Sequence, residues 1–236
     1  MIVEREFYIG FRMVDENLKL KSGEMLNTFV DVAGIQSELV GDGFDSESRW
    51  ILTSYNVKVF QKPRYTEVVK FITWSREYNH AIATREFEVR SLSGELLVCA
   101  VSTFVRYNVK TRKIEKITDD VMQAYQSEGN RTNFEGEKLA RFFEPEDSDA
   151  ELEEYADWKW MDLNHHMNNS HYVDLAQKAI EELYGVDTSE ADFDITFKRE
   201  VHKNTALKAL VKKTDFGFTV TIKSESGLHA GINIRV

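Results

Sequence analysis

The order of helical and strand-like segments constrains the fold of this chain most strongly, because the same order occurs twice. Residues 22–40 carry apolar side chains at helical spacing, and residues 171–184 do so again. Ser22 is expected to cap the first helix, and Gly41 and Gly185 to end the two helices. Several strand-like segments follow each helix. A lone helix beside such strands can bury its apolar stripe only against the apolar face of their sheet.

The strand-like segments have alternating or continuous apolar patterns and are separated by short turns such as Ser93-Gly94. In the first half they are residues 51–60, 67–78, 81–92 and 96–107, and in the second half they are residues 155–160, 194–202, 206–214, 218–224 and 229–236. A helix wrapped by an antiparallel sheet is the hotdog fold. The sequence therefore predicts an α+β double hotdog with two tandem helix-wrapped antiparallel sheets.

The domain boundaries follow from this repeated plan. We expect an N-terminal hotdog domain over residues 1–126, a linker over 127–150 and a C-terminal hotdog domain over 151–236. The linker region is rich in acidic and polar residues and contains Pro145, as connecting segments commonly are.

Composition excludes several classes of protein. The chain has 236 residues, of which 42% are hydrophobic, so it can bury a sizeable core. No run of apolar residues is long enough to span a membrane, and the first strand begins near Met1 without a leader, so we expect a cytoplasmic protein. The net charge of −10 argues against a nucleic-acid surface. The single cysteine, Cys99, excludes an internal disulfide and is expected to be a buried hydrophobe.

The segment Asp162–Asn169 concentrates acid/base chemistry immediately before the second helix. It reads Asp-Leu-Asn-His-His-Met-Asn-Asn and offers a carboxylate, three amides and two imidazoles. An imidazole can act as a general base near neutral pH. Asn168 and Asn169 stand where a helix cap is expected, and the free N–H groups at the helix start could stabilise an oxyanion. The segment therefore indicates where a catalytic site would lie.

The same segment resembles the active-site motif of acyl-ACP thioesterases, Asp-x-Asn-x-His-x-Asn-Asn followed by a helix. Its five fixed positions are filled by Asp162, Asn164, His166, Asn168 and Asn169. Two other stretches resemble that family, residues 197–201 (Phe-Lys-Arg-Glu-Val) and residues 50–53 with the turn at 62–65. Val201 stands where the family often has a cysteine, so a thiol at this position cannot be the nucleophile.

The resemblance implies a hydrolase that releases free fatty acid from the thioester of fatty acyl-acyl carrier protein. It implies catalytic roles for Asp162, Asn164, His166 and Glu200, with Asn168 and Asn169 supporting the oxyanion. Trp50 and Phe29 are expected to contact the acyl chain. General-base attack by water is the preferred mechanism, and direct attack by a carboxylate through an anhydride competes with it.

Glu200 poses a geometric problem for this site. Strict alternation places Phe197 and Val201 on one face of the expected strand and Glu200 on the other. A bulge or a strand end is therefore expected near Glu200 if it is to meet His166. In the first half, Lys19-Leu20-Lys21-Ser22 stands where the second half has its motif, so this half is expected to lack the chemistry and to shape the acyl pocket.

No cofactor and no metal are expected. A metal site formed by His165, His166, His171 and Asp162 is an alternative, although no cysteine or paired-carboxylate spacing supports it. His165 is expected to be a bystander.

Acyl carrier protein is the expected partner, and neither nucleic acid nor membrane is. Because that carrier is acidic, its docking requires a basic patch. Residues 198–213 hold six basic side chains against one acidic side chain, and Lys62 with Arg64 forms a second candidate. The chain is expected to be a monomer or a homodimer. The rival functions are an acyl-CoA thioesterase on the same fold and a non-catalytic acyl-binding protein.

Overall fold

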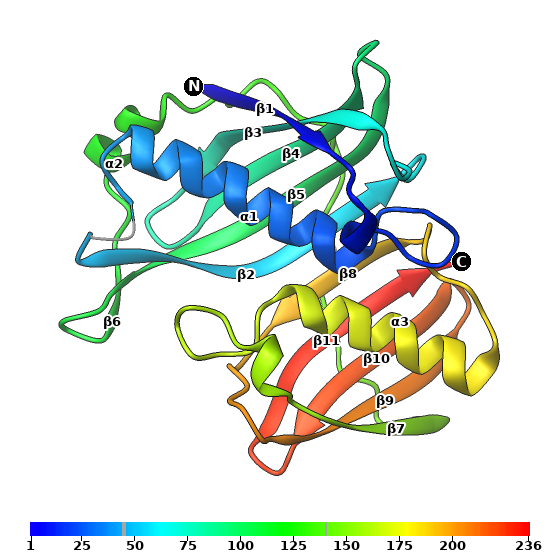
Figure 1. Ribbon diagram of the computed structural model, residues 1–236. Coiled ribbons are helices and arrows are strands. Elements are labelled where there is room, and N and C mark those ends of the chain that lie inside the picture. The colour runs from blue at the N-terminus through cyan, green and yellow to red at the C-terminus, as the bar shows by residue number, and fades with distance from the viewer. Residues whose placement is uncertain (44–45, 140) are drawn as a thin grey trace.

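In the computed structural model, which describes residues 1–43, 46–139 and 141–236, eleven strands form a single antiparallel sheet (Figure 1). The first half contains β1 (Ile2–Tyr8), α1 (Ser22–Leu39), β2 (Ser48–Val59), β3 (Val68–Tyr78), β4 (Ala83–Ser91), β5 (Leu96–Asn108), β6 (Lys113–Glu115) and α2 (Asp119–Tyr125). The second half contains β7 (Ala150–Tyr155), α3 (Ser170–Tyr184), β8 (Asp192–Phe197), β9 (Ala206–Thr214), β10 (Gly217–Ser224) and β11 (Gly227–Arg235). Two 3-10 helices, Phe11–Met13 and Trp158–Trp160, precede the two long helices.

The strand order is β1-β3-β4-β5-β2-β8-β11-β10-β9-β7, with β6 paired to β5. Each half thus forms its own run of strands, and the two runs join where β2 pairs with β8, from Ser54 opposite Thr196 to Val57 opposite Phe193. The prediction of a double hotdog is confirmed. The two tandem sheets are continuous with each other, because β2 pairs with β8 and this pairing leaves no exposed strand edge at the centre.

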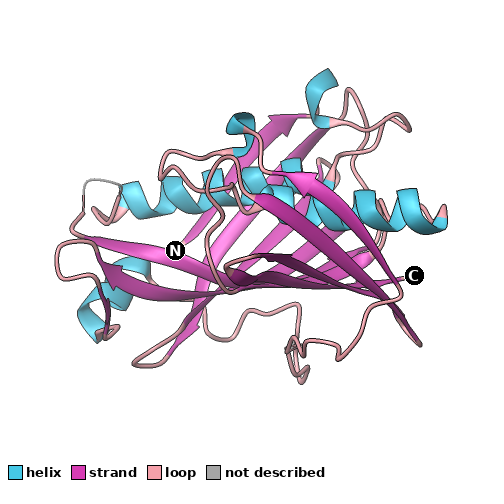
Figure 2. Cartoon of the chain, turned by 90° about the horizontal axis from the view of Figure 1, so that it is seen from below, coloured by secondary structure: helices cyan, strands magenta, loops and turns pink. Residues whose placement is uncertain are grey.

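Helices α1 and α3 lie along the same face of the sheet (Figure 2). Their apolar stripes form one continuous core with the inward-facing residues of the strands. Phe29 of α1 stacks on Phe87 of β4 with ring centroids 4.6 Å apart, and Val173 and Ala176 of α3 are fully buried. The helices are therefore held by tertiary burial of their apolar faces.

The helix ends agree with the expected stop residues. Gly41 and Gly185 follow α1 and α3 with φ of 72° and 66°, a left-handed conformation that costs glycine little. Ser22 is not the cap, because α1 already includes it and its hydroxyl accepts from the buried Lys62 ammonium at 3.0 Å.

Two expected strands have different bounds in the structure. Residues 155–160 were expected to be a strand, but β7 ends at Tyr155 and Trp158–Trp160 is a 3-10 helix capped by the Asp157 carboxylate. The strand expected over 194–202 is β8, which ends at Phe197.

The connection between α2 and β7 crosses the face of the sheet opposite the long helices. Trp74 donates its indole N–H to the carbonyl of Arg131, and Phe134 packs on the buried Cys99 and Val101. The expected linker therefore covers a sheet face. Among the described residues, no helix combines the length and apolarity needed to cross a membrane.

Candidate active site

The polar segment before α3 is a tight hairpin. Met161 and Met167 form an isolated bridge, and the N–H of Asp162 donates to the carbonyl of His166 at 2.7 Å. The Asp162 carboxylate accepts from the backbone N–H groups of Asn164 at 2.8 Å and His166 at 3.2 Å. His165 lies at the tip with φ of 64°, a conformation that histidine tolerates better than most residues. The Asp162 side chain therefore builds the turn that presents His166.

The first half contains a second copy of this hairpin, over residues 14–20. Val14 and Leu20 form the bridge, and the Asp15 carboxylate accepts from the N–H groups of Asn17 and Lys19, both at 2.9 Å. Leu18 takes the left-handed tip position with φ of 60°. Asp15 and Asn17 thus correspond to Asp162 and Asn164, and Lys19 corresponds to His166. The first half was expected to lack the chemistry of the second; it keeps the turn but has Lys19 where the second half has the histidine.

Glu200 is carried by an irregularity at the end of β8. The N–H groups of Lys198 and Arg199 both donate to the carbonyl of His229, at 2.8 and 3.3 Å. Two consecutive donors on one acceptor break the alternation and turn the chain out of the sheet. Val201 returns to the core, where its carbonyl accepts from the N–H of Met167 at 2.7 Å. The expected strand end therefore exists, and it brings the Glu200 segment beside the hairpin.

This arrangement is also duplicated in the first half. After β2, the N–H groups of Phe60 and Gln61 both donate to the carbonyl of Leu97, and the carbonyl of Pro63 accepts from Leu20 at 2.8 Å. These contacts place Lys62 in the position that corresponds to Glu200. The two halves thus share the backbone frame and the Asp/Asn turn, and differ at the histidine and the glutamate, which are both lysines in the first half.

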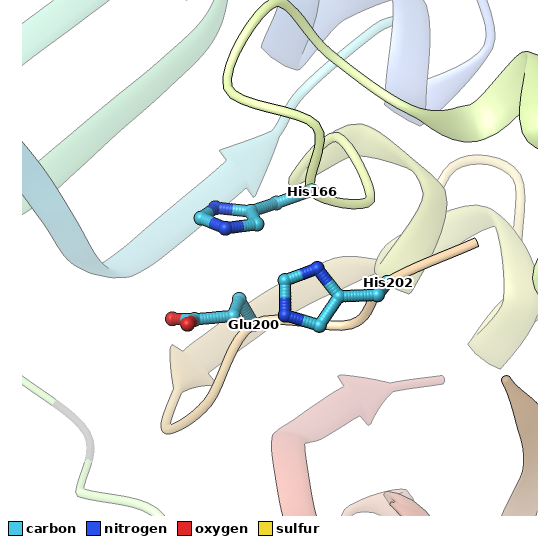
Figure 3. A group of neighbouring side chains, drawn as sticks. All are labelled: His166, Glu200 and His202. Carbon is cyan, nitrogen blue, oxygen red and sulfur yellow. The ribbon is translucent and has the colours of Figure 1, made fainter.

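His166, Glu200 and His202 gather at one point (Figure 3). Their donor atoms all lie within 4.8 Å of one another, and the rings of His166 and His202 meet edge to face with centroids 5.0 Å apart. Glu200 and His202 are exposed, and His166 is half-buried. The cluster could move protons or hold a divalent cation, and it differs from the metal set considered from the sequence. Sequence reasoning missed His202, although its spacing of two residues from Glu200 was the available signal.

A cavity of about 950 Å³ extends from His166 and Glu200 along the first half, whereas His202 lines a separate pocket with His165. From the second half the large cavity is lined by Asp162, Asn164, His166, Asn169, Tyr172 and Glu200, among others. From the first half it is lined by residues of α1, β2, β4, β5 and α2, including Trp50, Tyr55 and Arg85. A cavity of this size, with polar groups at one end and a largely apolar wall, suits an extended apolar ligand.

Three other residues considered from the sequence differ in their position relative to the cavity. Trp50 lines the cavity and donates its indole N–H to Asp42 and Tyr125. Phe29 is fully buried in the core between Tyr55 and Phe87 and is not among the lining residues. His165 is exposed and turned away from the large cavity.

The N–H groups at the start of α3 donate to acceptors of the residue just before the helix. The N–H of Ser170 donates to the Asn168 side chain at 3.0 Å, and the N–H of His171 donates to the Asn168 carbonyl at 3.0 Å. Asn168 is therefore the capping side chain, and these two N–H groups already have acceptors. Asn169 lines the cavity instead.

Tyr172 forms the wall between the two carboxylates and the core. Burial raises the pKa of its hydroxyl, and the negative charges of Glu200 and Asp162 raise it further. Its ring packs edge to face on Phe197 at 5.5 Å, at the point where β8 ends. The hydroxyl therefore stays protonated and is a neutral group beside the Glu200 and Asp162 carboxylates.

Comparison with known proteins agrees with this architecture. Residues 1–125 match the acyl-ACP thioesterase N-terminal domain, and residues 145–235 match the acyl-ACP thioesterase C-terminal domain. The acyl-[acyl-carrier-protein] hydrolase FATB3 of Cuphea viscosissima is 22% identical over 183 residues, which cover 73% of this chain and 44% of that protein. Oleoyl-acyl carrier protein thioesterase 1 of Arabidopsis thaliana is 25% identical over 181 residues, or 70% of this chain and 48% of that protein. The chain spans about half the length of these curated relatives.

Solved structures share the whole fold. A putative oleoyl thioesterase from Lactobacillus plantarum aligns with a TM-score of 0.84 at 21% identity, over 100% of this chain and 95% of that chain. An acyl-ACP thioesterase from Bacteroides thetaiotaomicron aligns with a TM-score of 0.84 at 20% identity, over 99% and 97% of the two chains. The two domain matches together cover most of the sequence, and on that ground the chain belongs to the acyl-ACP thioesterase family.

Proposed function

We propose that this protein hydrolyses the thioester of fatty acyl-acyl carrier protein and releases the free fatty acid. The observation that carries the proposal is a continuous cavity, with a largely apolar wall, that runs from His166 and Glu200 along residues of the first half. Such a cavity can hold an acyl chain while its thioester stays beside the acid/base groups. The relatives, an acyl-[acyl-carrier-protein] hydrolase and an oleoyl-acyl carrier protein thioesterase, agree with this substrate class.

The proposed mechanism is general-base attack by water. His166, with Glu200 beside it, takes a proton from a water molecule as its oxygen attacks the acyl carbon. The tetrahedral intermediate then collapses with cleavage of the carbon–sulfur bond. The departing thiolate recovers the proton from His166, which leaves a fatty acid and the carrier thiol. The first half supports the assignment of these roles to His166 and Glu200. Its hairpin keeps the same turn, although lysines stand at the positions that correspond to the histidine and the glutamate.

Asn169 is the proposed donor to the developing oxyanion. Its side chain reaches the cavity, whereas the first N–H groups of α3 are bound to Asn168. Removal of one such donor in known enzymes costs on the order of 3 kcal/mol of transition-state stabilisation. Asn169→Ala should therefore lower kcat by roughly a hundredfold at similar KM.

The decisive experiment compares the hydrolysis of acyl-ACP and acyl-CoA across chain lengths by the wild type, His166→Ala, Glu200→Gln and His165→Asn. His165→Asn is the matched control, since it changes the neighbouring imidazole at a tip that asparagine also tolerates. The first two variants should lose at least about a hundredfold in kcat while remaining folded. Equal turnover of acyl-CoA would favour the acyl-CoA thioesterase. Undiminished acyl binding without any turnover by the wild type would favour an acyl-binding protein.

The carrier protein is proposed to dock on Lys198, Arg199 and Lys203, which are exposed beside the mouth of the site. The other lysines of the basic segment are less available, because Lys208 pairs with Glu151 and Glu153, and Lys212 pairs with Asp147 and Asp149. Lys62, considered from the sequence, is only 1% exposed and cannot receive a partner.

Charge reversal tests this docking surface. Lys198→Glu with Lys203→Glu should raise KM for acyl-ACP and leave KM for a short acyl-pantetheine thioester unchanged. Lys208→Glu with Lys212→Glu serves as the matched control within the same basic segment. A larger KM increase in the control than in the test pair would exclude this surface.

A further inference from the structure

Three neighbouring strands place polar side chains in one row beneath α1. Arg85 of β4 lies opposite Ser102 of β5, and Ser102 lies opposite Tyr55 of β2. Arg85 and Tyr55 both line the cavity, and both come from the core-facing side of the sheet. A cavity intended only for a saturated chain would not require either group, because buried polar atoms without partners are costly.

The Arg85 guanidinium has only part of its hydrogen-bonding capacity used. Its hydrogen bonds run from Nη1 to the Gln36 side chain and to the Thr73 hydroxyl, the latter at 3.2 Å. Nε and Nη2 carry three more N–H groups, for which the described residues provide no acceptor. Its side chain is 7% exposed, and burial lowers its pKa to about 10, so it remains a cation at neutral pH.

No carboxylate in the described part of the chain forms an ion pair with Arg85. Asp42 also lines the cavity, but both of its oxygens accept from Arg106, at 2.7 and 2.9 Å. The Tyr125 ring lies 5.7 Å from the guanidinium and offers only its face. Buried cations are normally paired with an anion, so the unpaired Arg85 guanidinium indicates that a ligand binds there.

Tyr55 adds a second incomplete group. Its side chain is fully buried, and its hydroxyl has no hydrogen-bond partner among the described residues. The charge of Arg85 acts on the Tyr55 hydroxyl, so the two groups belong to one electrostatic environment. The hydroxyl can donate to a ligand oxygen, and the guanidinium can donate to the same oxygen or its neighbour.

We propose that Arg85 and Tyr55 form a polar subsite of the acyl cavity that receives an acyl chain bearing a hydrogen-bond-accepting oxygen. The oxygen can be that of a hydroxyl, an oxo group or a terminal carboxylate, since each presents the same acceptor. The inference rests on the proposed thioesterase function and specifies the substrate class. A saturated chain would leave the free donors of Arg85 and the Tyr55 hydroxyl unsatisfied, whereas an oxygen at the right position satisfies them.

The position of this oxygen along the chain follows from the sheet. The row Arg85–Ser102–Tyr55 continues to Ile195 of β8, which lies just before the bend that carries Glu200. Three strand spacings of about 4.8 Å separate β4 from β8, or roughly 14 Å. The thioester lies at the β8 end, so the accepted oxygen belongs on the distal part of the chain and not beside the thioester.

The test is a hydrolysis panel of acyl-ACP thioesters of one chain length: unsubstituted, 3-hydroxy, and with a hydroxyl, oxo or carboxyl group near the far end. The variants are Arg85→Met, which keeps the volume, Tyr55→Phe, which removes only the hydroxyl, and Arg90→Met, a matched control on the same strand outside the cavity. The wild type and Arg90→Met should prefer at least one distally oxygenated substrate by about tenfold or more in kcat/KM. Arg85→Met should reverse this preference and Tyr55→Phe should weaken it.

The outcomes separate the two proposals. Hydrolysis of unsubstituted substrate with no gain from any distal oxygen overturns the subsite while leaving the thioesterase function intact. A preference for the distally oxygenated substrates that survives Arg85→Met also overturns it. Absence of hydrolysis from every substrate refutes the proposed function instead. In that case, tighter binding of distal hydroxy fatty acids than of unsubstituted ones, lost in Tyr55→Phe, would still support the subsite.

Discussion

Asp162 is expected to act by building the turn that presents His166, and two substitutions separate this role from direct chemistry. Its carboxylate accepts two backbone N–H groups, those of Asn164 at 2.8 Å and His166 at 3.2 Å. Asp162→Ala removes both hydrogen bonds, which share the oxygen Oδ1. At a net value of about 1 kcal/mol for each bond, the ordered hairpin loses about 2 kcal/mol, and kcat should fall by up to roughly thirtyfold. Asp162→Asn keeps one acceptor oxygen in the same place, so kcat should fall only severalfold.

The duplicated hairpin provides the matched control for this experiment. Asp15 accepts the N–H groups of Asn17 and Lys19 with the same geometry, away from the His166 cluster. Asp15→Ala should therefore cost a similar free energy of unfolding, about 2 kcal/mol, and leave kcat within twofold of the wild type.

The assay is steady-state release of fatty acid from acyl-ACP, with urea denaturation of each variant as the measure of stability. The reasoning is refuted if Asp162→Asn loses as much activity as His166→Ala while remaining folded. That result would mean that the negative charge of Asp162 takes part in the chemistry, as in the anhydride mechanism.

Three further predictions concern buried groups. Burial lowers the pKa of Lys62 from 10.5 to about 8, so between these pH values the unfolded chain binds more protons than the folded one. The free energy of unfolding of the wild type should therefore rise with pH across that window. Lys62→Met should flatten this rise in urea denaturation at several pH values, and an unchanged slope would contradict the prediction. Burial raises the pKa of the Cys99 thiol to about 12, so a disulfide reagent should label it only after unfolding, and rapid labelling of the native protein would count against the packing described. Tyr55→Phe removes a buried hydroxyl without a partner and should raise the free energy of unfolding by about 1 kcal/mol, seen as a Tm increase of about 2–4 °C; a decrease would show that the hydroxyl is bonded.

Elements with strong local signals could be predicted from the sequence with small errors. The two long helices have apolar stripes and glycine stops, and the strand predicted over residues 206–214 has the bounds that the structure gives it. The strand predicted over residues 155–160 was wrong. The aromatic and apolar pattern there resembles that of a strand, but Asp157 caps a short 3-10 helix at Trp158–Trp160. The merging of the two sheets through β2 and β8 could not be predicted, since strand alternation does not say which edge a strand will pair with.

The candidate site was partly predictable for the same reason. The order of residues in the segment Asp162–Asn169 placed a histidine and its turn before a helix, and the need for an irregularity near Glu200 followed from the side-chain period of two. The resemblance of Asp15-x-Asn17 to Asp162-x-Asn164 was also present in the sequence, but it became visible only through matching hydrogen bonds. Two residues separated by two positions in a tight turn make a weak signal until their backbone is seen.

By itself, the sequence determined which segments form helices and strands and where acid/base side chains concentrate, because both depend on neighbours within a few residues. Tertiary structure alone decided that His202 joins His166 and Glu200, that Phe29 lies in the core, and that Arg85 and Tyr55 face one cavity. These facts depend on strand register and on which face of the sheet the helices cover. Register is set by packing across the whole sheet, where a shift of one residue in β4 or β2 would turn Arg85 or Tyr55 to the opposite face.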